Sequence, residues 1–193
     1  MVAGAPLTER TALKEWAVLV DAMARGEIIA MVRKGGIREQ RAGFSVRHER
    51  FLFYPTFFHE RPGELAPRFA AQLAASHAAQ PAEGTIRIEH LGEVAGVWPV
   101  SSLEPLRAID GMHGLAWSAV ESRFHYRQKP GVQVIAVRVL RLAEPVIVPE
   151  QRRYQGCVSW VALDEAIDVS NATPVLDDTS MLMRLAALRN ALG

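Results

Sequence analysis

Residues 132–142, VQVIAVRVLRL, are the stretch that most clearly determines the fold of this chain. The run is mainly apolar and follows the turn Lys129-Pro130-Gly131, which predicts a β-strand. The next segment, EPVIVP at 144–149, holds two prolines, and a proline cannot donate a backbone hydrogen bond to a neighbouring strand. We therefore expect a strong strand followed by a short edge segment.

Other parts of the chain predict a sheet with helices around it. The further strands are expected at 27–34, 44–54, 85–100 (one or two strands, bending at Gly92 and Gly96) and 157–163. The helices are expected at 9–25, 64–80, 110–126 and 178–191. This order predicts one α+β domain over residues 1–193, with a mixed, largely antiparallel sheet and flanking helices.

Two segments carry detailed patterns. In 9–25, Leu13, Trp16, Val20 and Met23 follow helical spacing, and Gly26 stands where a helix ends. In 44–54, alternate residues fall on opposite faces of a strand, with polar residues in the middle of both. We expect one of these faces to cover the core and the other to be partly open.

Composition limits the class of protein. Of 193 residues, 49% are hydrophobic and 22% are charged, as in an ordinary globular domain. The single cysteine, Cys157, excludes an internal disulfide and zinc-finger spacings. The first ten residues lack the pattern of a secretory signal, and no long apolar span occurs. We expect a cytoplasmic protein with no membrane partner, and the oligomeric state stays open.

Positive charge is concentrated in residues 33–61. This stretch holds seven basic and three acidic residues, a net charge of +4, whereas the rest holds 15 basic and 18 acidic residues. Such a concentration favours an anionic partner, either nucleic acid or an anionic small molecule. The candidate anion-binding residues are Arg33, Lys34, Gly35, Gly36, Arg38 and Arg50. Their spacing matches neither a Walker loop nor a dinucleotide fingerprint, so a hairpin turn with solvated basic residues is the alternative.

Histidines and aromatics provide candidate chemistry. His48 and His59 are candidate general bases, because a histidine near cations tends to stay neutral. The alternative is a half-buried histidine that bonds to backbone. Tyr54, His125, Tyr126 and Arg138 are candidates for stacking or substrate contact.

Two further placements bear on these candidates. In the helix expected at 110–126, His113, Trp117, Glu121 and His125 share one face, but they offer too few ligands for a metal, so no metal or cofactor is expected. Arg138 lies within a strand, where burial of its charge requires an ion-pair partner, such as Glu15 or Glu121, or an anionic ligand.

Four segments of the sequence resemble a bacterial family known as domain of unknown function 1802. They are ALKEWAVLVDAMARGEIIAMVRKGGI, FSVRHERFLFYPTFFH, RFHYRQKPGVQVIAVRVLRLAEPV and GCVSW, and the similarity covers roughly residues 12–163. The family has no established activity. The resemblance implies an association of some members with Mrr-type restriction endonuclease domains, and hence a restriction-modification or defence setting. A second likeness is architectural: a helix, Gly26-Glu27 and a strand ending in Arg33 resemble the RNA-binding barrels of the ASCH and pseudouridine-synthase-like group.

Three functions are compatible with these observations. In the leading hypothesis the chain binds nucleic acid or a nucleotide-like anion through residues 33–59, and the basic-aromatic segment 123–127 is a further candidate. The phosphate contacts come from Arg33, Lys34, Arg38 and Arg50, while His48, Tyr54 and His59 contact bases. In the second, the chain is a small enzyme for a phosphorylated or carboxylated substrate, with His48 or His59 as general base and Arg33 with Lys34 as the anion clamp. In the third, it is a non-catalytic protein-interaction module that uses exposed aromatics; the candidates are Phe51, Phe53, Phe57 and Phe58.

Overall fold

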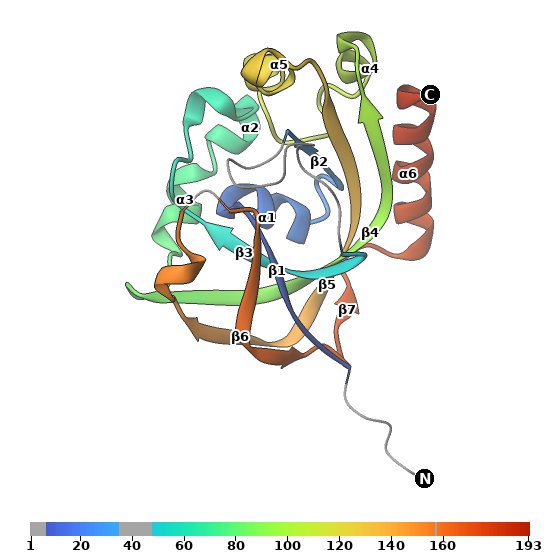
Figure 1. Ribbon diagram of the computed structural model, residues 1–193. Helices are drawn as coiled ribbons and strands as arrows, with labels where there is room; N and C mark the ends of the chain where they lie inside the picture. The colour runs from blue at the N-terminus through green and yellow to red at the C-terminus, as the bar shows by residue number, and fades with distance from the viewer. Residues whose placement is uncertain (1–6, 35–47, 157) are drawn as a thin grey trace.

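The computed structural model describes residues 7–34, 48–156 and 158–193, and a single mixed sheet forms its framework (Figure 1). The strands are β1 (Thr8–Trp16), β2 (Ala30–Arg33), β3 (Arg50–Thr56), β4 (Thr85–Val100), β5 (Val132–Pro149), β6 (Trp160–Asp168) and β7 (Thr173–Pro174). The helices are α1 (Ala17–Ala24), α2 (Pro67–Ala70), α3 (Leu73–Ala78), α4 (Leu103–Ala108), α5 (Trp117–His125) and α6 (Asp178–Leu192). Short 3-10 turns follow at Pro62–Glu64, Tyr126–Gln128 and Arg152–Tyr154.

The sheet confirms the predicted α+β class. Its order is β2-β5-β4-β3-β1-β6, with β7 paired to β5. β1 and β3 are parallel, and the other pairs of described strands are antiparallel.

The strand predicted at 132–142 is confirmed, but it is longer than expected. β5 continues to Pro149 and pairs with β4 from Val100↔Val132 to Thr85↔Pro149. The prediction of a separate edge segment at 144–149 is therefore wrong. β7 pairs with β5 only at Leu140 and Arg141. Among the described strands, β4 alone therefore pairs with the proline-containing end of β5. The other side of that end has no partner among these strands, so the N–H groups that its prolines lack are not needed there.

The helix predicted at 9–25 is wrong in its first half. Thr8–Trp16 forms β1, and only Ala17–Ala24 is helical. β1 pairs with β3 on one edge and with β6 on the other, and this pairing outweighs the helical spacing of the apolar residues. Gly26, with φ of 67°, follows the helix as expected.

Both faces of β3 are buried, so the expectation of a partly open face is wrong. Phe51 and Phe53 belong to the apolar cluster around α1, whereas Leu52 and Tyr54 belong to a second cluster on the opposite side. The four side chains belong to residues that are at most 3% exposed. The strand begins at Arg50, and the first part of the prediction, residues 44–47, lies outside the described residues.

Helix α1 lies in the middle of the molecule (Figure 1). Seven of its eight residues are buried, and it contacts β1, β3, β5, α2 and α3. Because the helix follows β1 directly, its N-terminal turn is held at the C-terminal end of that strand. This junction between β1 and α1 positions the candidate site.

Two predicted helices change in extent. Residues 64–80 divide into α2 and α3, and α5 begins only at Trp117. His113 lies before α5 and is 1% exposed, so the predicted stripe from His113 to His125 does not exist.

The C-terminal helix predicted at 178–191 is confirmed as α6. Asp177 caps it, because the Asp177 carboxylate accepts a hydrogen bond from the backbone N–H of Ser180 at 2.8 Å. Among the described residues, no helix has the length and apolar character needed to cross a membrane.

Candidate functional site

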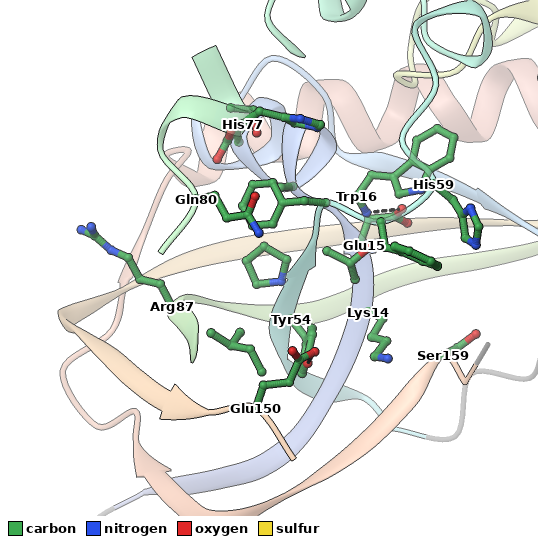
Figure 2. A pocket seen from close by; sticks show the side chains of 18 of the residues that line it. Lys14, Glu15, Trp16, Tyr54, His59, His77, Gln80, Arg87, Glu150 and Ser159 are labelled. Carbon is green, nitrogen blue, oxygen red and sulfur yellow. Dashed lines mark hydrogen bonds between the residues drawn. The ribbon is translucent and has the colours of Figure 1, made fainter. Parts of the chain in front are cut away.

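A cleft of about 1300 Å³ opens beside the junction of β1 and α1 (Figure 2). Residues from β1, the end of β2, the end of β3, α3, β4 and α5 line it, together with residues between β5 and β6. In Figure 2 the labelled side chains run from His77 at one end of the view to Lys14 and Ser159 at the other. The sheet and the central helix therefore place side chains from distant parts of the chain around one space.

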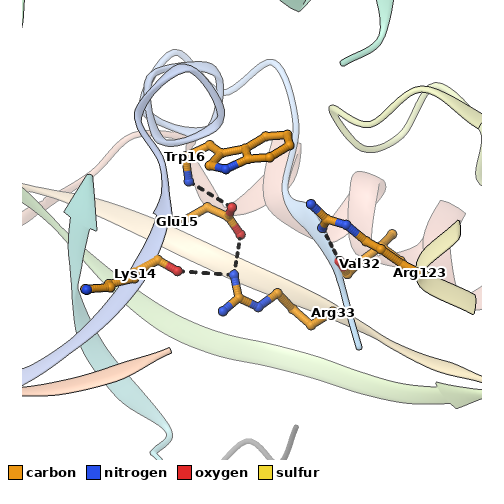
Figure 3. Close-up of polar contacts among 6 residues, drawn as sticks. All are labelled: Lys14, Glu15, Trp16, Val32, Arg33 and Arg123. Carbon is orange, nitrogen blue, oxygen red and sulfur yellow. Dashed lines mark hydrogen bonds and ion pairs between the residues drawn. The ribbon is translucent and has the colours of Figure 1, made fainter. Parts of the chain in front are cut away.

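One corner of the cleft is built on Glu15, at the end of β1. A Glu15 carboxylate oxygen accepts a hydrogen bond from Arg33 Nη1 at 2.9 Å, and the other accepts the backbone N–H of Trp16 at 2.9 Å (Figure 3). The same Arg33 nitrogen donates to the carbonyl of Lys14 at 3.1 Å. The side chains of Arg33 and Glu15 are 14% and 5% exposed, so this ion pair is largely removed from water.

Arg123, on α5, brings a second guanidinium to this corner. Its Nη1 donates to the carbonyl of Val32 at 2.9 Å, and its guanidinium carbon lies 5.4 Å from the centre of the Trp16 ring. Burial lowers the Arg123 pKa, while the negative charge of Glu15 opposes that shift. The corner, defined as Glu15, Arg33, Lys34 and Arg123, thus holds one carboxylate against three cations.

Lys34 is fixed by backbone oxygens. Its Nζ donates to the carbonyls of Phe124 at 3.0 Å and Gly131 at 2.5 Å, and also to that of Lys129. Burial, with help from the nearby charge of Lys129, lowers the Lys34 pKa. Lys34 therefore ties the end of β2 to the connection between α5 and β5, and it contributes charge to the cleft from a fixed position.

A second wall is formed by Tyr54 on β3. Its hydroxyl donates to Glu150 Oε1 at 3.0 Å, and Lys14 Nζ lies 5.2 Å from the centre of its ring. Burial, followed by the charge of Glu150, raises the Tyr54 pKa above its usual value. Tyr54 is thus a buried, neutral phenol whose hydroxyl is bonded to Glu150.

A third feature is the pair Glu60–His77. Glu60 Oε2 lies 2.6 Å from His77 Nε2, and Glu60 Oε1 accepts the backbone N–H of Val18 at 3.1 Å. The Glu60 side chain has no exposed area, while that of His77 is 44% exposed and lines the cleft. Burial raises the Glu60 pKa, and the bonds to Val18 and His77 oppose this.

The structure places the residues predicted from sequence in several different locations. Five of them line the cleft: Arg33, Lys34, Tyr54, His59 and Tyr126. Gly35, Gly36 and Arg38 lie outside the described residues. The remaining four do not line the cleft: His48, Arg50, His125 and Arg138.

The four residues outside the cleft have separate contacts. The His48 ring lies 5.0 Å from the Trp160 ring, and Arg50 Nε lies 3.7 Å from a Glu9 oxygen. His125 is exposed at the end of α5. Arg138 pairs with Asp178 at 2.7 Å, so neither Glu15 nor Glu121, the partners expected from the sequence, forms this ion pair.

The comparison with protein families can now be set beside this geometry. A family profile described as "Domain of unknown function (DUF1802)" matches residues 12–186. The chain belongs to the DUF1802 family. No curated protein matches this DUF1802 chain.

Two solved structures are similar to this DUF1802 chain at low identity. The crystal structure of ASCH from Zymomonas mobilis has 11% sequence identity and a TM-score of 0.43, and the match covers 92% of this chain and 94% of that one. A mutant of ASCH from the same organism has 10% identity and a TM-score of 0.44, with 95% and 99% covered. At this sequence identity and TM-score, the two structures carry no information about the function of this chain.

Several side chains of the DUF1802 cleft were not predicted from the sequence. These are Glu15 as the partner of Arg33 and the Glu60–His77 pair, whereas Arg123, which lines the cleft, belongs to the candidate segment 123–127. Glu60 and His77 are 17 residues apart, so no short motif marks them. The only sequence signal is that Glu60 is the next-to-last residue of the +4 segment, beside the candidate His59.

Among the described residues, no group of three or more histidine, cysteine, aspartate or glutamate side chains is arranged to hold a metal ion. Glu60 and His77 could supply two ligands, but a protein metal site commonly uses three or four.

Proposed function

We propose that this DUF1802 protein binds a nucleotide-like anion in the cleft, either as a free nucleotide or as one nucleotide of a single strand. The proposal is carried by the excess of cations at the corner of Glu15, Arg33, Lys34 and Arg123. A charge that is removed from water needs an opposite charge or hydrogen-bond partners nearby. A phosphate group seated here would face the guanidinium groups of Arg33 and Arg123.

The excess is local to this corner. Among the described residues that line the cleft, five are lysine or arginine and four are aspartate or glutamate. Glu150 is bonded to Tyr54 and Glu89 is paired with Arg87. Glu64, a weaker influence on Arg123, lies 3.7 Å from Arg61. Attraction for an anion is therefore strongest beside Glu15.

Aromatic side chains near the corner suit a planar base. Trp16 follows Glu15 directly, and Tyr126 and Phe58 line the same cleft. Tyr126 is 43% exposed and Phe58 76% exposed, so both rings present free surface. Stacking of a base on an aromatic ring contributes about 1–3 kcal/mol and tolerates different bases. A ligand with a phosphate and a flat ring fits both features.

The other two hypotheses receive less support. An interaction surface built on four phenylalanines loses two of them, because Phe51 and Phe53 are each 1% exposed. For the enzyme hypothesis, His48 is disfavoured as the base because it lies away from the cleft, whereas the other candidate base, His59, lines it. A restriction-modification setting stays part of the proposal only as a context in which a nucleotide-binding cleft would serve.

The test is a binding titration of the full chain with AMP, inorganic phosphate and a short single-stranded oligonucleotide, at about 50 and about 200 mM salt. We expect binding that weakens at the higher salt concentration. Saturation by AMP would identify a free nucleotide as sufficient, whereas binding of the oligonucleotide alone would identify a strand. Absence of salt-dependent binding for all three probes would overturn the proposal.

A charge-removing variant makes this test specific to the corner. Glu15→Gln removes the negative charge that pairs with Arg33 and acts on Arg123, so AMP binding is expected to tighten by about tenfold, ~1.4 kcal/mol. Glu104→Gln is the matched control, because Glu104 is exposed on α4 and does not line the cleft. Equal affinities of the two variants, with both folded, would contradict the assignment of this corner.

A further inference from the structure

Two exposed aromatic side chains line the cleft. Among the described phenylalanine, tyrosine and tryptophan residues, only Phe58 and Tyr126 are exposed, at 76% and 43%. Both of them line the cleft. Single exposed rings are normal on a protein surface, but the gathering of both exposed rings in one cleft indicates a surface that a ligand covers.

Phe58 lies on a short loop that is held at both of its ends. Before the loop, Thr56 on β3 pairs with Trp16 at the end of β1. After it, Glu60 Oε1 accepts the backbone N–H of Val18 on α1 at 3.1 Å, and the Glu60 side chain has no exposed area. Phe58 is two residues from each of these contacts, which is at most about 7 Å of chain. The loop therefore lies beside the end of β1, where the corner begins.

Tyr126 is attached to the corner through different elements. It follows α5 directly, three residues after Arg123. Lys34 Nζ donates to the carbonyl of Phe124 at 3.0 Å and to that of Lys129. Two bonds of a corner cation therefore fix the chain on either side of Tyr126.

The corner thus lies between the two rings. In Figure 3, Glu15 and Trp16 enter the corner from the junction of β1 and α1, and Arg123 enters it from α5. The loop of Phe58 belongs to the first side, and Tyr126, at the end of α5, belongs to the second. A phosphate in the corner therefore has an exposed aromatic ring on each side.

The backbone beside both rings is strained. Three described residues other than glycine have a positive φ, namely His59 at 65°, Arg127 at 58° and Gln128 at 56°. His59 follows Phe58, and the other two follow Tyr126. The left-handed region is unfavourable for residues with a Cβ, and it persists mainly at functional sites where surrounding contacts enforce it. Among the described residues other than glycine, this strain is confined to the two segments that present the rings.

We propose that the ligand is a single-stranded nucleic acid whose phosphodiester lies at the corner, with one adjoining base stacked on Phe58 and the other on Tyr126. The inference rests on the proposed function, because the corner must hold the phosphate, and it selects the strand over the free nucleotide. A mononucleotide has one base and can cover one ring only, whereas a dinucleotide step carries a base on each side of its phosphate. The cleft volume of about 1300 Å³ also exceeds the roughly 300–1,000 Å³ of a typical small-molecule pocket.

The recognition that follows is for unpaired bases. Stacking on an aromatic ring tolerates different bases, because every base has a flat face. A base in a duplex is stacked within its own strand and is not free to cover a protein ring, whereas the bases of a single strand can be splayed apart. The two rings therefore select a strand with unpaired bases and do not read its sequence.

The experiment compares AMP with the dinucleotide adenylyl-(3′→5′)-adenosine, ApA, in calorimetric titrations of the full chain at about 200 mM salt, where differences in charge are partly screened. AMP carries a charge of about −2 and one base, whereas ApA carries a single diester charge and two bases. Charge alone would make AMP the tighter ligand. We expect ApA to bind at least about fivefold more tightly, because one further stacked base adds roughly fivefold to a hundredfold.

The variants Phe58→Ala and Tyr126→Ala separate the two rings. ApA should lose about fivefold to a hundredfold in affinity in each variant. AMP should lose more than about twofold in only one of them at most, because it has one base. Leu182→Ala is the matched control, because Leu182 is 63% exposed on α6 and does not line the cleft. All three side chains are exposed, so the melting temperatures should stay close to that of the original chain.

A second measurement locates each base. Two dinucleotides carry 2-aminopurine, whose fluorescence is quenched when it stacks on an aromatic ring, at the 5′ or at the 3′ position. We expect Phe58→Ala to remove the quenching at one position and Tyr126→Ala to remove it at the other. A response of both positions to the same variant, or of neither position to either variant, would overturn the inference.

The outcomes separate this inference from the proposed function. Equal affinities of AMP and ApA, or tighter binding of AMP, would overturn the inference and leave the proposed function standing. Absence of binding by both probes at low and high salt would overturn both. If the rings instead serve as contacts for a protein partner, ApA affinity will be the same in Phe58→Ala, Tyr126→Ala and the original chain, and the inference is then wrong.

Discussion

Acidification is expected to destabilise this protein through two buried histidines. His90 and His113 are 9% and 1% exposed, and burial lowers the pKa of each to about 4. In the unfolded chain a histidine titrates near its ordinary pKa of about 6.5. The unfolded state therefore binds protons first as the pH falls. The stability contribution is present above about pH 6.5 and is lost between about pH 6.5 and 4.

The size of the effect follows from these pKa values. For one histidine with a pKa of about 4 when folded and about 6.5 when unfolded, the loss in the free energy of unfolding between about pH 7 and 5 is about 2 kcal/mol. Two such histidines give about 3–4 kcal/mol, a large share of the roughly 5–15 kcal/mol that stabilises a typical domain. Asp21 and Glu60, whose pKa values are raised by burial, shift stability in the opposite direction, so variants are needed to isolate the histidines.

The assay is urea unfolding followed by tryptophan fluorescence at several pH values. In His113→Asn, the Asn Oδ1 can replace His113 Nδ1, which accepts the N–H of Leu115 at 3.2 Å. We expect this variant to lose about 2 kcal/mol less than the original chain between about pH 7 and 5, and His90→Gln to behave likewise. His125→Gln, at an exposed position, should retain the full dependence. The reasoning is refuted if both buried-site variants show the same pH dependence as the original chain.

Three further predictions concern local packing and hydrogen bonds. Gly114→Ala should lower the free energy of unfolding by about 1–3 kcal/mol in urea, because the added Cβ would clash with Leu19. Gly63→Ala is the control, because the space around Gly63 is open, and equal losses in the two variants would contradict this explanation. Asp177→Ala should cost about 1 kcal/mol and reduce helical circular dichroism, since it removes the cap of α6; an unchanged melting temperature would argue against the cap. Tyr54→Phe should cost about 1–2 kcal/mol because Glu150 loses its donor, and the loss should disappear in the double variant with Glu150→Gln if this bond is responsible.

Part of the fold could be predicted from local sequence. The apolar run of β5 and the spacing of α6 correspond to what forms, because both elements bury one consistent set of side chains. β1 could not be predicted, since Leu13 and Trp16 fit a helix equally well until β3 and β6 pair with the segment. The period of side chains within one segment carries no information about its neighbours.

The candidate site likewise contains residues that local sequence marks and residues that only tertiary packing brings together. Arg33 and Lys34 stood out as adjacent cations, and both reach the cleft. Their partners did not stand out, because Glu15 is 18 residues from Arg33 and the carbonyls that hold Lys34 lie in the last turn of α5 and after it. The contact of Glu60 with His77 depends on where α3 packs against α1. Proximity of this kind is set by tertiary packing, so charge counting along the chain locates the cations and leaves their environment undetermined.

The central claim is that an anion occupies the corner beside Glu15, and a crystal structure of the protein with bound AMP tests it most directly. The account predicts the phosphate within hydrogen-bond distance of the Arg33 or Arg123 guanidinium, with the base against an aromatic side chain of the cleft. A phosphate found instead on exposed arginines away from the cleft, with the corner unchanged, would contradict it.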